Sequence, residues 1–173
     1  VHFEEAADYF EKKSKENVHP NIRLNNESGY FNSIYRLSTC YRNLRLYQKE
    51  DSLINIGLRR LHNTAQLSTE YGYFQKGKGV QLLRLGNTDD ALQYFKQSKD
   101  ILRHHQDDAS LMTVYFYMGK AYWSDRKRAE SLQYLNKVDS LVNKFWFVTP
   151  EIRSGYEYLI KDAKQTIKAA VTR

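Results

Sequence analysis

Hydrophobic residues recur at intervals of three and four through most of the chain, most clearly between residues 79 and 98. Val80 and Leu83 come before the sequence Leu-Gly-Asn, and Leu92 and Phe95 follow it. This spacing places apolar side chains on one face of an α-helix, and a glycine next to an asparagine interrupts such a helix. The segment therefore predicts a helix, a tight turn and a second helix.

The same pattern returns at a nearly fixed period. A shift of 40 residues brings Gly79 onto Gly119 and Phe95 onto Leu135, and a shift of 41 in the other direction brings Gly79 onto Ser38. A small residue where two helices cross lets their backbones come close, and a large residue fills the space beside it. Because one helix pair cannot bury its apolar face alone, the repetition predicts stacked helix pairs.

The first helix pair leaves one position of the pattern open. The strict register puts Glu50 where the second helix takes a small residue, and a slip of two residues would put Ser52 there instead. The two registers would bury different side chains against the neighbouring helix.

The pattern predicts an all-α chain of about eight helices in one domain, residues 1–173. A single helix at 2–17 has the spacing of a second helix, a loop containing Pro20 follows it to Asn26, and one closing helix follows Pro150. The expected helices span 2–17, 27–46, 48–63, 67–86, 88–105, 108–125, 128–144 and 150–170, so that complete repeats occupy 27–63, 67–105 and 108–144. Because both ends are half-repeats, we expect a fragment of a longer repeat protein.

Composition agrees with long helices and limits the chemistry. The 173 residues include only 8 Gly and 2 Pro, 41% are hydrophobic, and 27% are charged. No apolar run is long enough to span a bilayer, so we expect a soluble domain. The one cysteine, Cys40, excludes an internal disulfide and a cysteine-built zinc site. We expect it to be a small buried residue.

Sequence motifs indicate no catalysis. The chain has no nucleophile elbow, phosphate loop or dinucleotide fingerprint, and its five histidines lack the spacing of a metal site. We therefore expect no catalytic residue, no metal, no cofactor and no enzymatic activity. A solvated helix end explains His104 and His105 better than a surface metal site, and a solvated turn explains the basic segment 125–128 better than a nucleic-acid contact.

The apolar segment Phe145-Trp146-Phe147-Val148 is unusual for a linker. One interpretation is that this segment packs the last helix onto the third helix pair. The other is that it forms an exposed site for a partner.

The repeated positions carry small and large residues in a fixed order. They are Ile34, Leu37, Ser38, Tyr41 and Leu44 in the first repeat, Gly79, Leu82, Leu85, Gly86, Ala91, Phe95 and Ser98 in the second, and Tyr115, Met118, Gly119, Tyr122, Ser131, Leu135 and Val138 in the third. This set resembles the tetratricopeptide repeat (TPR), in the bacterial form with a period of about 40 residues. The resemblance implies antiparallel helix pairs stacked in a right-handed superhelix.

The resemblance also implies a ligand groove lined by the first helix of each pair. Its positions correspond to Tyr35, Arg42, Asn43, Tyr73, Lys76, Arg84, Phe116, Lys120 and Trp123. This set joins aromatic rings to cations and contains no acid, which favours an extended acidic or aromatic peptide. The Lys and Asn clamp of the chaperone-binding members is absent, because Val80 replaces one of its asparagines.

We therefore expect a scaffold that binds a protein or peptide. In proteins of this kind such a module senses or docks within a larger bacterial regulatory protein. The net charge of +7 leaves nucleic-acid binding as the alternative. The sequence leaves the compartment open between bacterial cytoplasm and periplasm, and it does not fix the oligomeric state.

Overall fold

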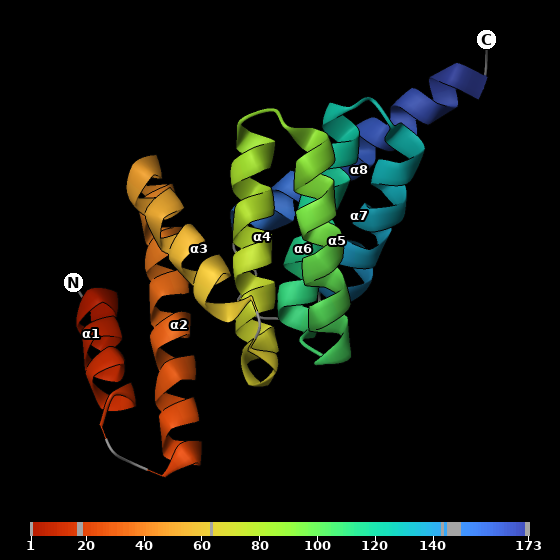
Figure 1. Ribbon diagram of the computed structural model, residues 1–173. Helices are drawn as coiled ribbons and strands as arrows, with labels where there is room; N and C mark the ends of the chain where they lie inside the picture. The colour runs from red at the N-terminus through yellow and green to blue at the C-terminus, as the bar shows by residue number, and fades with distance from the viewer. Residues whose placement is uncertain (1, 17–18, 63, 143, 145–149, 172–173) are drawn as a thin grey trace. The chain divides into compact units, whose positions relative to one another are not determined.

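The computed structural model describes residues 2–16, 19–62, 64–142, 144 and 150–171 of the chain (Figure 1). These residues form eight α-helices and one short 3₁₀ turn, and helices that follow one another in sequence pack together. The prediction of an all-α helical repeat is confirmed. The helices are α1 (His2–Ser14), α2 (Pro20–Asn43), α3 (Tyr47–Leu61), α4 (Ser68–Arg84), α5 (Thr88–His104), α6 (Asp108–Ser124), α7 (Arg128–Val142) and α8 (Pro150–Val171), and the 3₁₀ turn η1 is Ala65–Leu67.

The chain divides into two compact units, Val1–Lys78 and Gly79–Arg173. Unit 1 contains α1, α2, α3 and most of α4, and unit 2 contains the end of α4 and the helices from α5 to α8. The division falls inside a continuous helix. The number of domains therefore stays a prediction.

The start of α2 corrects the sequence prediction. The pattern predicts a loop through Pro20 as far as Asn26, but α2 begins at Pro20 itself. Proline suits the first turn of a helix because the N–H group that it lacks would have no helical partner there. His19 caps the same end, since its Nδ1 accepts a hydrogen bond from the backbone N–H of Asn21 at 3.3 Å. The proline therefore starts the helix.

Four turns between helices share one backbone geometry. Each contains one residue in the left-handed region, and the residue after it donates a backbone hydrogen bond to a carbonyl five positions earlier. The left-handed residues are Arg45 (φ 59°), Gly86 (φ 80°), Gln106 (φ 57°) and Arg126 (φ 60°). This is the Schellman pattern, for which glycine is preferred. Of the four turns, only the one at Gly86 has a glycine at the left-handed position, so only this turn could be predicted from the sequence.

Replacing Gln106 by glycine is expected to raise the free energy of unfolding by roughly 0.5–1 kcal/mol. A side chain in the left-handed conformation costs roughly 1–2 kcal/mol, and the entropy of an added glycine offsets part of that gain. Urea denaturation measures the change. Gln97→Gly, in the exposed middle of α5, is the control and should lose about 1 kcal/mol. A Gln106→Gly variant no more stable than the unsubstituted chain would contradict the turn geometry.

Two glycines lie where the repeat places a small residue. A methyl group on Gly79 would come within 2.5 Å of the Phe95 ring, and one on Gly119 within 2.7 Å of the Leu135 side chain. Such distances are far shorter than a van der Waals contact, so only glycine fits without repacking. The crossings predicted from the 40-residue period are therefore confirmed within unit 2. In the first pair, Ser38 is fully buried.

The two single helices at the ends pack against their neighbours. In unit 1, α1 lies along α2, with Ala7 buried and the Phe10 ring against Gly29. In unit 2, α8 packs on α7 and α6, where Tyr156 and Leu159 join the hydrophobic cluster of those helices. Each end helix therefore has one face inside the core of its own unit.

Candidate functional site

The nine predicted groove residues fall into two groups, one in each unit. Unit 1 contains Tyr35, Arg42, Asn43, Tyr73 and Lys76, and unit 2 contains Arg84, Phe116, Lys120 and Trp123. A single groove formed by all nine stays a prediction. Within each unit the surroundings of these side chains differ strongly.

In unit 1, two tyrosines and a lysine form a compact cluster. The Tyr35 ring on α2 stacks on the Tyr73 ring on α4, with centroids 5.6 Å apart and planes 29° apart. The Lys76 Nζ lies 5.5 Å from the Tyr35 centroid and 5.4 Å from the Tyr73 centroid. Lys76 is only 7% exposed. Among the residues that the structure describes, no carboxylate lies within ion-pair distance of this ammonium.

A nearly buried lysine side chain beside two stacked aromatic rings makes this cluster chemically distinctive. A cation over an aromatic face gains about 0.5–2 kcal/mol, more where water is excluded. An anionic group that reached Lys76 would meet a positive charge in surroundings of lower dielectric constant than open water. The cluster, defined as Tyr35, Tyr73 and Lys76, is therefore the candidate site. Its members are three of the predicted residues.

A network of polar side chains lies one turn along the same helices. Ser28 Oγ donates to Glu70 Oε1, and Asn32 Nδ2 donates to Ser28 Oγ at 3.3 Å and to Glu70 Oε1 at 3.4 Å. Glu70 is 8% exposed. Residues 28, 32 and 35 of α2 and residues 70 and 73 of α4 are spaced at helical intervals. The polar network therefore extends the face that carries Tyr35 and Tyr73.

Arg42 has a partner that the groove positions alone do not reveal. Its Nε lies 2.6 Å from Glu50 Oε1 on α3, and the Glu50 side chain is fully buried. Ser52 is exposed, and its hydroxyl donates to the Gln48 carbonyl at 3.0 Å. The strict register is therefore correct and the register shifted by two residues is wrong. The ion pair fixes α2 to α3, so Arg42 supports the fold.

In unit 2, the closing helix engages Trp123. The Trp123 Nε1 donates to Asp162 Oδ2 on α8 at 2.6 Å, and the Arg128 guanidinium lies 4.7 Å from the indole centroid. Arg128 Nε lies 3.2 Å from the same carboxylate oxygen. The interpretation of segment 125–128 as a solvated turn is thus wrong for Arg128. This side chain links α7 to Trp123 and to α8.

The other predicted residues are buried or lie on the surface. Phe116 is buried, and a methyl group on Gly155 of α8 would lie 3.3 Å from its ring. Asn43, Arg84 and Lys120 are exposed. Phe116 and Trp123 therefore help to hold α8 in unit 2, which leaves the cluster in unit 1 as the better candidate for contact with a ligand.

A second aromatic cluster was not predicted. Tyr122 stacks on Tyr134 with centroids 5.5 Å and planes 9° apart, and Lys137 Nζ lies 5.1 Å from the Tyr115 centroid and 5.0 Å from that of Tyr134. These residues come from both helices of the third pair, so the many tyrosines do not belong to one surface. The sequence signal for this cluster was the 40-residue period, which brings Tyr94 onto Tyr134.

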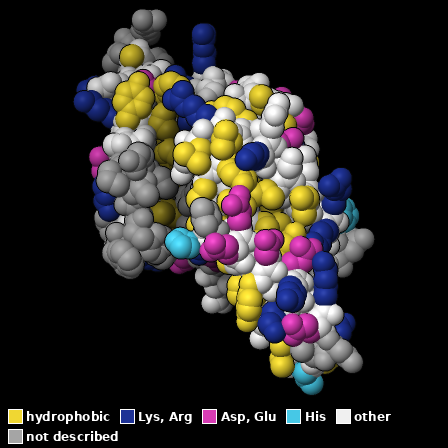
Figure 2. All heavy atoms as spheres, turned by 90° about the vertical axis from the view of Figure 1, so that its left-hand side faces the viewer, with side chains coloured by type: hydrophobic (Ala, Val, Ile, Leu, Met, Phe, Trp, Pro, Cys, Tyr) yellow, Lys and Arg dark blue, Asp and Glu magenta, His cyan; other side chains and the backbone are white. Residues whose placement is uncertain are grey.

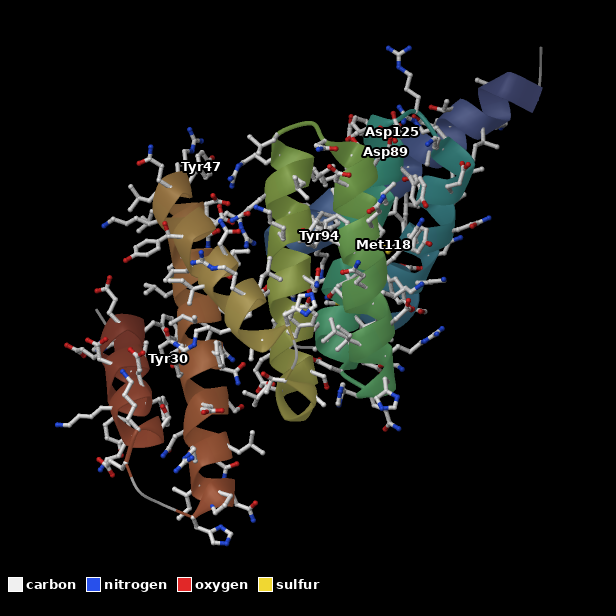
Figure 3. All side chains as sticks on the ribbon, in the orientation of Figure 1. Tyr30, Tyr47, Asp89, Tyr94, Met118 and Asp125 are labelled. Atoms are coloured by element: carbon white, nitrogen blue, oxygen red, sulfur yellow. The ribbon has the colours of Figure 1, made fainter. Side chains whose placement is uncertain are left out.

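Burial raises the pKa of four tyrosines above the ordinary value of 10.0, namely Tyr115, Tyr122, Tyr156 and Tyr30, the last on the side of α2 toward α1 (Figure 3). The folded state thus favours the neutral phenol. Stability from this source is complete below pH 10 and is lost as pH rises through the folded-state values. Urea denaturation between about pH 8 and pH 11 should show a falling free energy of unfolding. Tyr122→Phe should flatten the fall, and an unchanged slope would contradict the assignment.

Other candidate chemistry receives little support. The described residues, His104 and His105 among them, contain no group of three or more His, Cys, Asp or Glu side chains arranged to hold a metal ion. Cys40 is a free thiol and is half-buried, so the expectation of a small buried residue is wrong. The segment Phe145–Val148 lies outside the described residues. None of the described helices combines the length and apolar character required to cross a membrane.

Comparisons with protein-family models, with curated proteins and with solved structures find no match to this chain. The resemblance to the tetratricopeptide repeat therefore rests on the repeated residues and on the helical repeat fold.

Proposed function

We propose that the chain is a non-enzymatic scaffold of the tetratricopeptide-repeat type that binds an extended acidic peptide. The cluster of Tyr35, Tyr73 and Lys76 provides the primary contact. The observation that carries the proposal is the nearly buried Lys76 side chain, whose ammonium lies beside two stacked tyrosine rings and has no ion-pair partner among the described residues. A sensing or docking module of a larger bacterial regulatory protein is the setting that fits such a scaffold.

The chemistry of the cluster suits a carboxylate beside an apolar or aromatic side chain. A carboxylate oxygen that reached Lys76 Nζ would form a charge-assisted hydrogen bond beside the two tyrosine rings. The exposed edges of Tyr35 and Tyr73 would contact the neighbouring side chain of the peptide. The amide of Asn32 and the carboxylate of Glu70 lie one turn away and could orient the peptide backbone.

Charge placement favours a peptide over a nucleic acid. Several cations have carboxylate partners within their own unit: Arg42 with Glu50, Lys78 with Asp51, Arg60 with Glu11 and Arg128 with Asp162. A nucleic-acid surface requires many cations available to phosphates. Cations already paired with acids contribute less to such a surface than the net charge of +7 suggests.

A binding panel at two salt concentrations tests the proposed ligand class. Fluorescence anisotropy would compare a peptide of about ten residues rich in Glu and Tyr, the same peptide with Lys for Glu, and single-stranded RNA of about ten nucleotides. The acidic peptide should bind most tightly and lose only a few-fold affinity between about 50 and 200 mM salt, because few ions are released. Tighter binding of the RNA, with a steep salt dependence, would contradict the proposal.

A further inference from the structure

Two nearly buried charges of opposite sign lie on α4 in unit 1, three positions before and three positions after Tyr73. Glu70 is 8% exposed and Lys76 is 7% exposed. Neither side chain forms an ion pair with the other or with another described residue. Given the proposed function, on which this inference rests, we infer that the carboxylate of Glu70 binds a cationic side chain of the same peptide whose carboxylate binds Lys76.

The carboxylate of Glu70 is held in place, but only one of its oxygens is used. Both hydrogen bonds that it accepts, from Ser28 Oγ and from Asn32 Nδ2 at 3.4 Å, go to Oε1. Asn32 Nδ2 also donates to Ser28 Oγ at 3.3 Å, so two residues of α2 orient the carboxylate. Oε2 accepts no hydrogen bond from a described residue, although it is not among the polar atoms sealed from solvent. It is therefore accessible to a donor on a ligand.

The neutral surroundings of this carboxylate favour a cation as the ligand group. Ser28 and Asn32 donate hydrogen bonds to Glu70 without neutralising its charge. A nearly buried carboxylate is rare unless a cation or a metal ion pairs with it. Within the part of the chain that the structure describes, Glu70 belongs to no group of side chains arranged to hold a metal ion. The ammonium of a lysine or the guanidinium of an arginine supplies both the charge and the donor.

Exposed carboxylates elsewhere on the chain offer a weaker site. Figure 2 shows several acidic side chains in contact with solvent on one face of the molecule. A cation beside such a carboxylate gains at most about 1 kcal/mol, because water and salt screen the charges and both side chains lose freedom. Glu70 is already oriented by its hydrogen bonds, so less freedom is lost when a cation binds. It is therefore better suited than the exposed acids to select a ligand.

The spacing of the two charges predicts the pattern of the peptide. Six positions of a helix, from 70 to 76, correspond to about 9 Å along its axis. An extended peptide advances about 3.3 Å per residue, so three residues span about 10 Å. Tyr73 lies midway and stacks on Tyr35, so the residues between the two charges of the peptide would contact these rings. The predicted ligand is an extended peptide with a Lys or Arg three positions from a Glu or Asp.

Fluorescence anisotropy with matched peptides tests the cation site. The set contains the acidic peptide of about ten residues and derivatives with Lys or Gln three positions before or after its central Glu. In one of the two orders the Lys peptide should bind about fivefold or more tightly than its Gln counterpart, because it adds a hydrogen bond between charged groups. Glu70→Gln should remove this difference, since the amide oxygen still accepts from Ser28 and Asn32 but carries no charge. The control Glu130→Gln makes the same change of charge at an exposed position of α7 and should keep the difference.

The outcomes separate the cation site from the proposed function. Equal affinities of the Lys and Gln peptides in both orders, or a difference that persists in Glu70→Gln, would overturn the cation site while the acidic peptide still binds. Circular dichroism would show that Glu70→Gln keeps its helical content, so that a loss of the difference reports the charge. Failure of every peptide to bind the unsubstituted chain would contradict the proposed function itself and overturn the cation site with it.

Discussion

Replacing Glu50 by alanine is expected to lower the free energy of unfolding by about 3–5 kcal/mol. The carboxylate is fully buried and lies 2.6 Å from Arg42 Nε, while the Arg42 side chain is 16% exposed. Removing one partner leaves the other charge in a site poor in water, which costs more than the ion pair contributes. The variant also leaves a cavity at a position where α2 and α3 meet.

Urea denaturation of Glu50→Ala measures this loss. The control is Ser52→Ala, at the exposed position that the shifted register would bury, and it should change stability by less than about 0.5 kcal/mol. The double variant Arg42→Met/Glu50→Leu should recover most of the loss, because apolar residues of similar volume can replace a buried ion pair. Equal effects of Glu50→Ala and Ser52→Ala would contradict the buried pair.

Replacing Phe95 by alanine is expected to destabilise the chain by about 3–5 kcal/mol. The ring is fully buried and stacks on Tyr117 with planes 12° apart. It packs so closely on Gly79 that a methyl group added there would lie 2.5 Å from it. Its removal leaves a cavity where α4 and α5 cross, and the helices cannot close this cavity without shifting. The loss arises from packing and should not depend on salt.

Thermal and urea denaturation at low and high salt would measure the effect of Phe95→Ala. Gln93→Ala, an exposed position on the same helix, is the matched control and should be nearly neutral. Gly79→Ala tests the other side of the crossing. It should cost about 1–3 kcal/mol through overpacking, and less when Phe95 is also replaced by leucine. Additive effects of the two changes would contradict the close approach.

The repeat was predictable from sequence because its signal is local and recurs. Gly79 and Gly119 are small residues at a fixed period, and each faces the large residue that the period assigned to it. The start of α2 was missed because Pro20 was interpreted as a sign of a loop, although proline also fits the first turn of a helix. Spacing alone does not separate these two uses of proline.

The candidate site was predictable only in part because its chemistry depends on contacts between distant segments. The positions of Tyr35, Tyr73 and Lys76 follow from the repeat register. The partners of Arg42 and Trp123 do not, because Glu50 and Asp162 lie on other helices at positions that the register assigns to no ligand. Predicted groove residues therefore include some that hold helices together.

Isothermal titration calorimetry of the acidic peptide against Lys76→Met tests the central claim most directly. The substitution keeps an unbranched apolar side chain against Tyr35 and Tyr73 and removes only the charge. We predict an affinity loss of about 10–100-fold, the value of a hydrogen bond to a charged group, while Lys96→Met, at an exposed position on α5, binds as the unsubstituted chain does. Equal affinities of Lys76→Met and Lys96→Met would contradict the assignment of the cluster as the binding site.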